Sequence, residues 1–123
     1  MDITIINIVN RGEASEECVT LVAEKDCNLS GYIILDTTYL ESGIVSNKSR
    51  HSYTFPKRSI KKGELVCLFT GEGEDEIDCC PEYVSHDFYW GLKKSVWNDD
   101  GDCAMLAHVK YGQTFHVAEA AKE

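Results

Sequence analysis

Residues 98–102 combine four oxygen-bearing side chains with one glycine, a composition that could bind a metal ion. Calcium prefers carboxylates on a sharply turning backbone, so Asp99, Asp100 and Asp102 are the metal-ligand candidates. The alternate ligand spacing and the distal glutamate of an EF-hand loop are absent, however. Asp-Gly is also a common turn sequence, because it supplies left-handed backbone. We therefore expect residues 98–101 to form a turn, with Asp100 and Gly101 as turn residues and no metal.

Acidic residues at 72–78 leave one alternative open. If they met residues 98–102 in space, the two loops could hold calcium or a small ligand. This arrangement would make the protein a ligand-binding β-sandwich rather than an interaction module.

Two tryptophans, Trp90 and Trp97, lie just before this acidic cluster. Exposed together, they could form an aromatic platform for a sugar or a peptide. A large aromatic side chain that flanks a strand is more often core, because it buries roughly 150–250 Å². We expect both to pack in the core.

Catalytic groups do not gather in the sequence. The four histidines fall in different segments, and neither a nucleophile elbow nor a phosphate-binding glycine loop is present. Cys79 and Cys80 could be redox active, but neighbouring acids would raise their pKa values, and adjacent residues of a strand point to opposite faces. The six cysteines include no Cys-x-x-Cys pair that would indicate zinc. We predict no enzymatic activity and no cofactor.

The acidic composition excludes some partners. With 21 acidic and 12 basic residues, the chain has a formal charge of −9, which makes it an unfavourable binder of nucleic acid. No apolar run approaches the roughly 20 residues of a membrane span. Without a targeting segment, we expect a cytoplasmic protein with reduced thiols. If a leader has been removed, the alternative is an exported protein, and the cysteines would become a disulfide framework.

Apolar residues alternate with period two, and turn residues interrupt them about every ten positions, which predicts short β-strands. The acidic segment 72–82 is expected to have no regular structure. The run 31–37 is nearly continuous in apolar character, as expected for a strand buried between two layers. The last two runs are separated by residues 110–112 and predict a hairpin. The strand-like runs are residues 3–9, 16–24, 31–37, 51–56, 64–71, 102–109 and 113–119.

These runs predict the fold class. About seven to nine short, mostly antiparallel strands without helices leave a β-sandwich or a small barrel. The continuous run Ile33-Ile34-Leu35 favours the sandwich. No repeat or linker divides the chain, so residues 1–123 are expected to form a single domain.

The order of the segments resembles the lamin tail domain family, an immunoglobulin-like β-sandwich found in nuclear lamins and in bacterial and archaeal proteins. The likeness covers about residues 16–118. Two departures are a tyrosine at position 32, where the family usually has tryptophan, and the insertion at 72–87. The segments that carry it are EECVTLVAE, CNLSGYIILDTT, HSYTFPKRSIKKGELVCLFTGEG, DFYWGLKKSVWNDDGDCAML and YGQTFHVAE.

The resemblance implies an immunoglobulin-like fold and a set of structural residues. It makes residues 87–106 a connection into a hairpin, in which Trp97 plugs the core and Asp102 begins the next strand. The residues expected in the core or its turns are Tyr32, Phe55, Trp90, Trp97, Asp100 and Gly101.

The resemblance also implies a class of function. Lamin tails look like binding and scaffolding modules that contact proteins and sometimes DNA, and the acidic charge disfavours DNA here. We therefore expect a non-catalytic module that binds a protein partner or a second copy of itself through a sheet edge or the loops at one end.

Overall fold

The computed structural model of the chain describes residues 1–38, 51–97 and 102–118. These residues form ten β-strands and no helix. The described part of the chain therefore contains no helix that could cross a membrane. Two strands have only two residues each, which leaves eight longer ones. The strands are β1 (Ile3–Val9), β2 (Cys18–Ala23), β3 (Cys27–Asn28), β4 (Tyr32–Thr38), β5 (Ser52–Thr54), β6 (Ser59–Ile60), β7 (Leu65–Phe69), β8 (Glu76–Cys79), β9 (Val84–Tyr89) and β10 (Asp102–His108).

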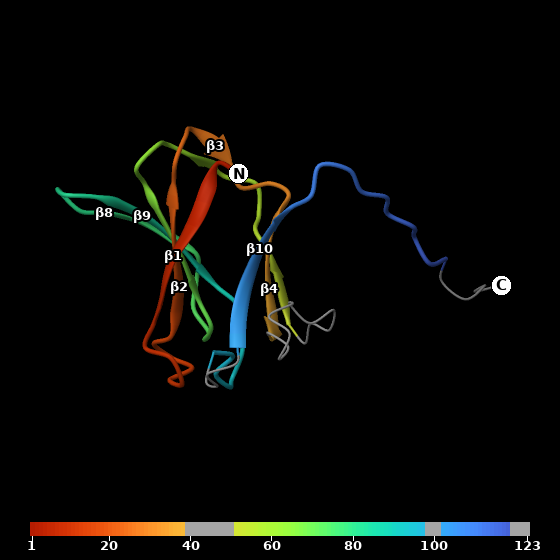
Figure 1. Cartoon of the computed structure of the whole chain (residues 1–123), viewed down its shortest axis with the longest axis horizontal. Coiled ribbons are helices and arrows are strands. Elements are labelled where there is room, and N and C mark those ends of the chain that lie inside the picture. The colour runs from red at the N-terminus through yellow and green to blue at the C-terminus, as the bar shows by residue number, and fades with distance from the viewer. Residues whose placement is uncertain (39–50, 98–101, 119–123) are drawn as a thin grey trace.

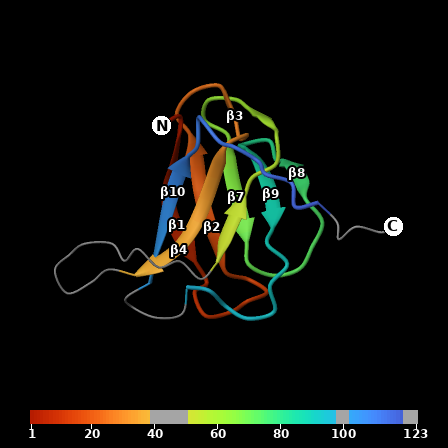
Figure 2. The same cartoon turned by 90° about the vertical axis from the view of Figure 1, so that its right-hand side faces the viewer.

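The strands form two main sheets that pack face to face (Figure 1). The larger sheet has the order β1-β2-β7-β9-β8, and the smaller has the order β10-β4-β5. Strands β3 and β6 pair separately. In the turned view, β4 and β10 cross in front of the larger sheet (Figure 2). The predictions of an all-β fold and of a two-layer sandwich are therefore confirmed.

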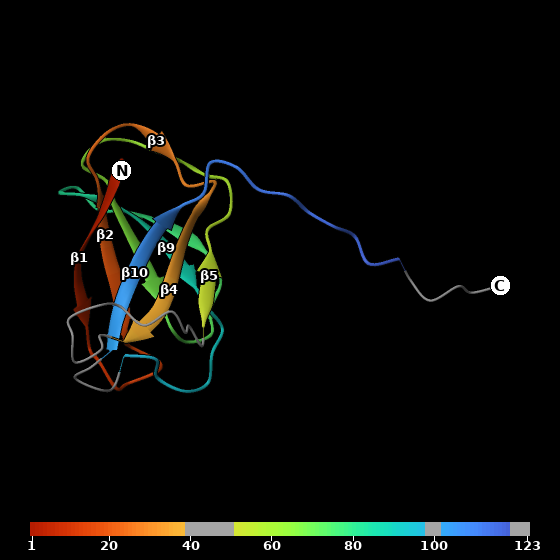
Figure 3. The same cartoon turned by 45° about the vertical axis from the view of Figure 1, so that its right-hand side comes forward.

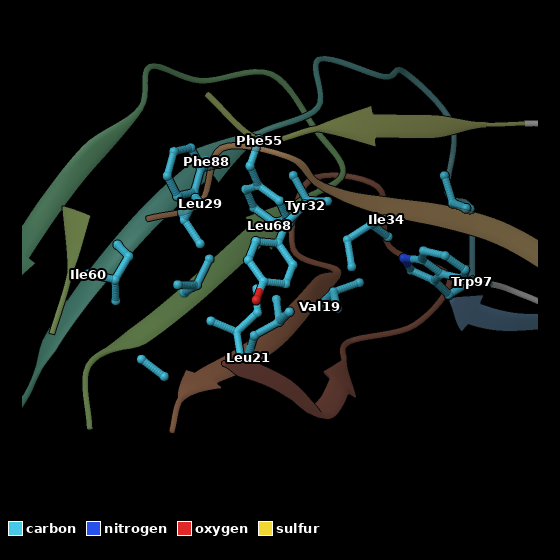
Figure 4. Close-up of a cluster of buried hydrophobic side chains, with 14 residues drawn as sticks. Val19, Leu21, Leu29, Tyr32, Ile34, Phe55, Ile60, Leu68, Phe88 and Trp97 are labelled. Atoms are coloured by element: carbon cyan, nitrogen blue, oxygen red, sulfur yellow. The ribbon is translucent and has the colours of Figure 1, made fainter. Parts of the chain in front are cut away.

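The core lies between the two sheets and has an aromatic centre (Figure 4). The rings of Phe55 and Phe88 meet edge to face with centroids 5.3 Å apart, which joins the smaller sheet to the larger. Trp97 closes the cluster at one end. Such edge-to-face pairs add a favourable quadrupole interaction to the burial of apolar area.

Alternation along β2 selects its core face. Val19, Leu21 and Ala23 are buried against the smaller sheet, and Thr20 and Val22 between them are only half-buried. Because side chains alternate across a strand, a period of two places every second residue in the core.

Seven strand pairings occur among the described residues, six of them antiparallel. The exception is the parallel pair β7–β9. Parallel neighbours need a long crossover, which is usually helical. Here residues 70–83 make the crossover and contain β8, which pairs antiparallel with β9.

A buried carboxylate holds three segments together at one end of the sandwich. Oε2 of Glu17 accepts hydrogen bonds from the Thr70 hydroxyl at 2.6 Å, the Val96 amide at 2.6 Å and the Trp97 amide at 3.4 Å. Oε1 accepts from the Gly12 amide at 3.1 Å. Buried charges are stable only when such donors replace water. Glu17 therefore positions the segment that carries Trp97.

Two sequence expectations about secondary structure were wrong. Residues 72–82 contain β8, because the backbone of Glu76–Cys79 pairs with β9 although all four side chains are exposed. Residues 113–118 form no strand, so the expected hairpin after β10 is absent. Residues 87–89 belong to β9, so the segment that carries Trp97 connects β9 directly to β10.

The expectation for residues 31–37 was correct in position but wrong about burial. Strand β4 is central in its sheet, with β10 and β5 on its two sides. Tyr32, Ile34 and Asp36 are buried on its inner face, whereas Ile33 and Leu35 are half-buried on the outer face. No second layer covers that outer face in the described part of the chain.

Candidate interaction site

Strand β10 ends the smaller sheet and has one free edge. Its seven residues pair with β4 from Asp102↔Thr38 to His108↔Tyr32 without a register shift. Within the described ranges, no strand pairs with its other side. A regular free edge presents a row of backbone donors and acceptors to another chain.

Backbone geometry shows which residues of β10 face this free edge. The amide of Val109 donates to the carbonyl of Gly31 at 2.8 Å, so the backbone groups of odd-numbered β10 residues point to β4. On β4, the amide of Asp36 points away to the β5 side, so Asp36 and its neighbour Ala104 do not bond to each other. Successive backbone groups point to opposite sides of a strand. The residues that face the free edge are Asp102, Ala104, Leu106 and His108.

The other strands that end a sheet are less suited to pairing. Strand β1 is interrupted by a register shift between Ile5 and Asn7, with Ile6 exposed. Such bulges protect an edge. Strand β5 has three residues, and β8 has four that include Glu76 and Asp78. The free edge of β10 is thus the longest regular one described.

The core is incompletely covered between β10 and β1. Ala104 and Leu106 of β10, and Ile5 and Ile8 of β1, pack against the core but remain half-buried. At one end of this side, the Tyr32 ring stacks on His108 with centroids 4.0 Å apart. An added strand beside β10 would cover this apolar margin.

Residues 109–118, which we call the tail, leave the end of β10 in an extended path away from the two sheets (Figure 3). Tyr111, Phe115 and Val117 are 93%, 84% and 87% exposed. Large apolar side chains are rarely this exposed together on a monomer. The tail and the free edge of β10 together form the candidate interaction site.

The structure places the predicted core residues inside the sandwich. Tyr32, Phe55 and Trp97 are buried in the core cluster. Trp90 is half-buried, with its ring centroid 6.3 Å from that of Trp97 and 6.0 Å from that of Tyr53. The two indoles therefore pack together at the margin of the core, and the Trp97 ring is closed to a ligand.

The expected turn and the alternative calcium site lie partly outside the described residues. Asp99, Asp100 and Gly101 fall outside the described ranges, whereas Asp102 begins β10. The acids at 72–78 are exposed, and those at 76 and 78 belong to β8. Among the described residues, no three acidic, histidine or cysteine side chains converge on a point that could hold a metal ion.

All six cysteines are described, and none forms a disulfide. Cys79 is exposed and Cys80 half-buried on the β8–β9 hairpin. A second pair lies on β2 and β7, where a hydrogen bond from the thiol of Cys18 lowers the pKa of Cys67 to about 7. The same contact raises the pKa of Cys18. The two thiols with the largest pKa shifts, Cys18 and Cys67, therefore lie on other strands than the adjacent pair Cys79 and Cys80.

Two histidine–carboxylate pairs connect separate segments. Nδ1 of His51 lies 2.8 Å from Oδ2 of Asp36, and Nε2 of His86 lies 3.0 Å from Oε1 of Glu64. The first pair joins β4 to the segment before β5, and the second joins the start of β7 to β9. Both pairs can therefore act as structural links between strands.

The sequence analysis missed the free edge of β10, because it paired this strand with residues 113–119. The apolar pattern of residues 113–119 indicated a strand, and such a pattern gives no information about which chain supplies the neighbouring strand. No protein-family model matches the chain, and no curated protein matches its sequence. The function is therefore argued from the geometry of the site.

Proposed function

We propose that the chain is a non-catalytic interaction module of the immunoglobulin-like, lamin-tail kind. It binds an extended segment of a partner protein, or of a second copy, along the free edge of β10. The observation that supports this function is a seven-residue strand in regular register whose outer side has no strand beside it among residues 1–38, 51–97 and 102–118. Strand addition at such an edge is a common mode of peptide recognition.

The surroundings of the edge supply both parts of strand recognition. Backbone groups of Ala104, Leu106 and His108 would provide hydrogen bonds that do not depend on the partner's sequence. Alternate side chains of the incoming strand would contact the half-buried margin formed by Ile5 and Ile8. Main-chain bonds supply affinity, and side-chain contacts supply specificity.

We also propose that the module acts in the cytoplasm. The six unpaired cysteines support this location, because thiols remain reduced there. Counting free thiols in protein purified without reductant checks it, and recovery of fewer than six would contradict it.

A proline at position 104 tests strand addition directly. The amide of Ala104 faces the free edge, so Ala104→Pro removes a donor and places the ring in the path of an incoming strand. The ladder to β4 keeps its bonds. Ala104→Ser is the matched control, because it retains the amide.

Partner capture is then compared between the variants. The immobilised full-length chain is exposed to a lysate of its source cells, and captured proteins are quantified by mass spectrometry. We expect Ala104→Pro to reduce capture about tenfold or more, and Ala104→Ser to leave it unchanged. Equal capture by the proline variant, with an unchanged unfolding midpoint, would refute binding at this edge.

A further inference from the structure

We infer that the partner of the β10 edge is the tail of a second copy, and that two copies exchange tails reciprocally. This inference rests on the proposed function and names the segment that the edge binds. The tail has the pattern of a strand with one apolar face, since Tyr111, Phe115 and Val117 are all odd-numbered and all at least 84% exposed. The described part of each chain thus contains both the free edge of β10 and a strand-like segment that pairs with no described strand.

The direction of the tail favours a second copy over the tail's own β10. The amide of Val109 is bonded to Gly31, and the chain bends at Lys110 directly after this bond. Residues 111–118 then run outward and are exposed throughout (Figure 3). A hairpin would require reversal directly after Val109. The bend at Lys110 instead directs residues 111–118 away from their own β10, where a second molecule can reach them.

A two-fold axis near residue 110 joins the two copies in this arrangement. With the bend at Lys110 straightened on pairing, residues 102–118 of one chain would run antiparallel to the same residues of the other, so each tail lies beside the other chain's β10. In this pairing, even-numbered residues of one chain lie directly across from even-numbered residues of the other, and odd-numbered from odd-numbered. Two residues that lie directly across from each other project their side chains from the same face of the sheet. The even-numbered tail residues then meet the free backbone groups of Ala104, Leu106 and His108.

The odd numbering of the apolar tail residues also determines which face of the sheet they contact. Tyr111, Phe115 and Val117 would project from the same face as Met105, the outer face of the smaller sheet. Among the described residues, the part of that face formed by Met105, Ile33 and Leu35 is apolar and has no strand over it, because Met105 is 39% exposed and Ile33 and Leu35 are half-buried. Thr37, farther along the same face, is buried. The two unusual surfaces of the molecule, the tail and this outer face, would therefore cover each other.

The low charge of the tail is consistent with its binding to a second copy. Lys110 is the only Lys, Arg, Asp or Glu in residues 109–118, whereas the chain as a whole carries a net charge of −9. A segment with so little charge of its own can approach an acidic molecule at low electrostatic cost.

Complementary variants test the exchange. In the tail variant, Phe115→Ser with Val117→Ser removes two exposed apolar side chains, so the fold should be unaffected. In the edge variant, Ala104→Pro blocks the acceptor and leaves the tail intact. The matched control, Ile77→Ser with Tyr83→Ser, removes two exposed apolar side chains from the β8–β9 hairpin and leaves both the tail and the β10 edge intact. Sedimentation or light scattering of full-length chains over a concentration series measures the mass.

We expect the wild-type chain and the control to reach twice the mass of the 13.8 kDa chain. The tail variant and the edge variant should each dissociate at least tenfold more readily. Mixing these two variants should restore a one-to-one dimer, because the intact edge of one accepts the intact tail of the other. Only tail–edge pairing predicts this rescue.

Three results would overturn the exchange. One is a wild-type chain that stays monomeric at every concentration. Another is dimerisation that the edge variant retains. The third is a monomer in which tail amides are protected from hydrogen exchange, because this would show a hairpin within one chain. If the chain is monomeric but captures other proteins in an Ala104-dependent way, the exchange fails and the proposed function stands.

Discussion

Glu17 shows how one residue can organise a distant part of the chain. Its carboxylate is fully buried and accepts hydrogen bonds from residues 12, 70, 96 and 97. A carboxylate in such a position is stable because four donors replace its water shell. Trp97 fills the end of the core, and Glu17 fixes the backbone that places it there.

Replacing Glu17 with alanine should destabilise the fold strongly. Two buried backbone amides, the buried Thr70 hydroxyl and the part-buried Gly12 amide would lose their acceptor, and each buried donor left unsatisfied carries a desolvation cost. We expect the free energy of unfolding to fall by about 3–5 kcal/mol. Urea unfolding followed by tryptophan fluorescence measures the change.

The adjacent Glu16 gives a matched control, because its side chain is exposed. Glu16→Ala should change the free energy of unfolding by no more than about 0.5 kcal/mol. Equal effects of the two substitutions would show that the loss of a negative charge, rather than of the buried bonds, is responsible.

At the scale of elements, the end of β10 depends on a close approach to Gly31. This glycine has φ of +90°, and a Cβ atom added to it would lie 2.7 Å from the Val109 carbonyl oxygen. A side chain there would force Val109 away and break its bond to Gly31. The position of Val109, where β10 passes into the tail, therefore depends on residue 31 being a glycine.

Gly31→Ala should weaken the end of β10. The left-handed backbone costs an alanine about 1–2 kcal/mol, and the clash adds roughly 1 kcal/mol for the lost hydrogen bond. Hydrogen exchange of the Val109 amide should become faster, and the unfolding midpoint in urea should fall.

Gly63→Ala separates these two effects. Gly63 has φ of +87°, but nothing lies within 4 Å of an added Cβ atom. It should therefore show the backbone cost alone and leave exchange at Val109 unchanged. If Gly63→Ala were as costly as Gly31→Ala, contact with Val109 would have no role.

The elements could be predicted from the sequence wherever one face of a strand is apolar. Residues 3–9, 16–24 and 64–71 contain strands because alternation there reflects burial directly. Strand β8 was missed because its residues are all exposed and its pairing uses only backbone groups. Residues 113–118 were misassigned because their alternation is real but no strand in the described part of the same chain pairs with them.

The candidate site was predictable only in part for the same reason. The aromatic residues could be assigned to the core from their size and flanking pattern, as for Phe55 and Trp97. The free edge of β10 depends on which strands become neighbours, and the parallel pair β7–β9 shows that sequence order does not determine this. Long-range pairing has no local pattern that identifies it.

For the whole molecule, net charge should govern self-association. Two copies that each carry −9 repel each other, and salt screens this repulsion. The Debye length falls from about 30 Å at 0.01 M salt to about 10 Å at 0.1 M. Raising sodium chloride over this range should tighten association of the chain, as measured by sedimentation equilibrium. Weaker association at higher salt would indicate that ion pairs, rather than backbone and apolar contacts, hold the copies together.

The ladder between β2 and β7 has a consequence for the rate at which the protein folds. It joins Cys18 to Phe69 and Val22 to Leu65, so a long stretch of chain must close before the central strands meet. Domains dominated by such distant pairings fold on a scale of roughly milliseconds to seconds, whereas helical bundles need microseconds to milliseconds. During that delay the apolar strands of a newly made chain are open to contact with its neighbours.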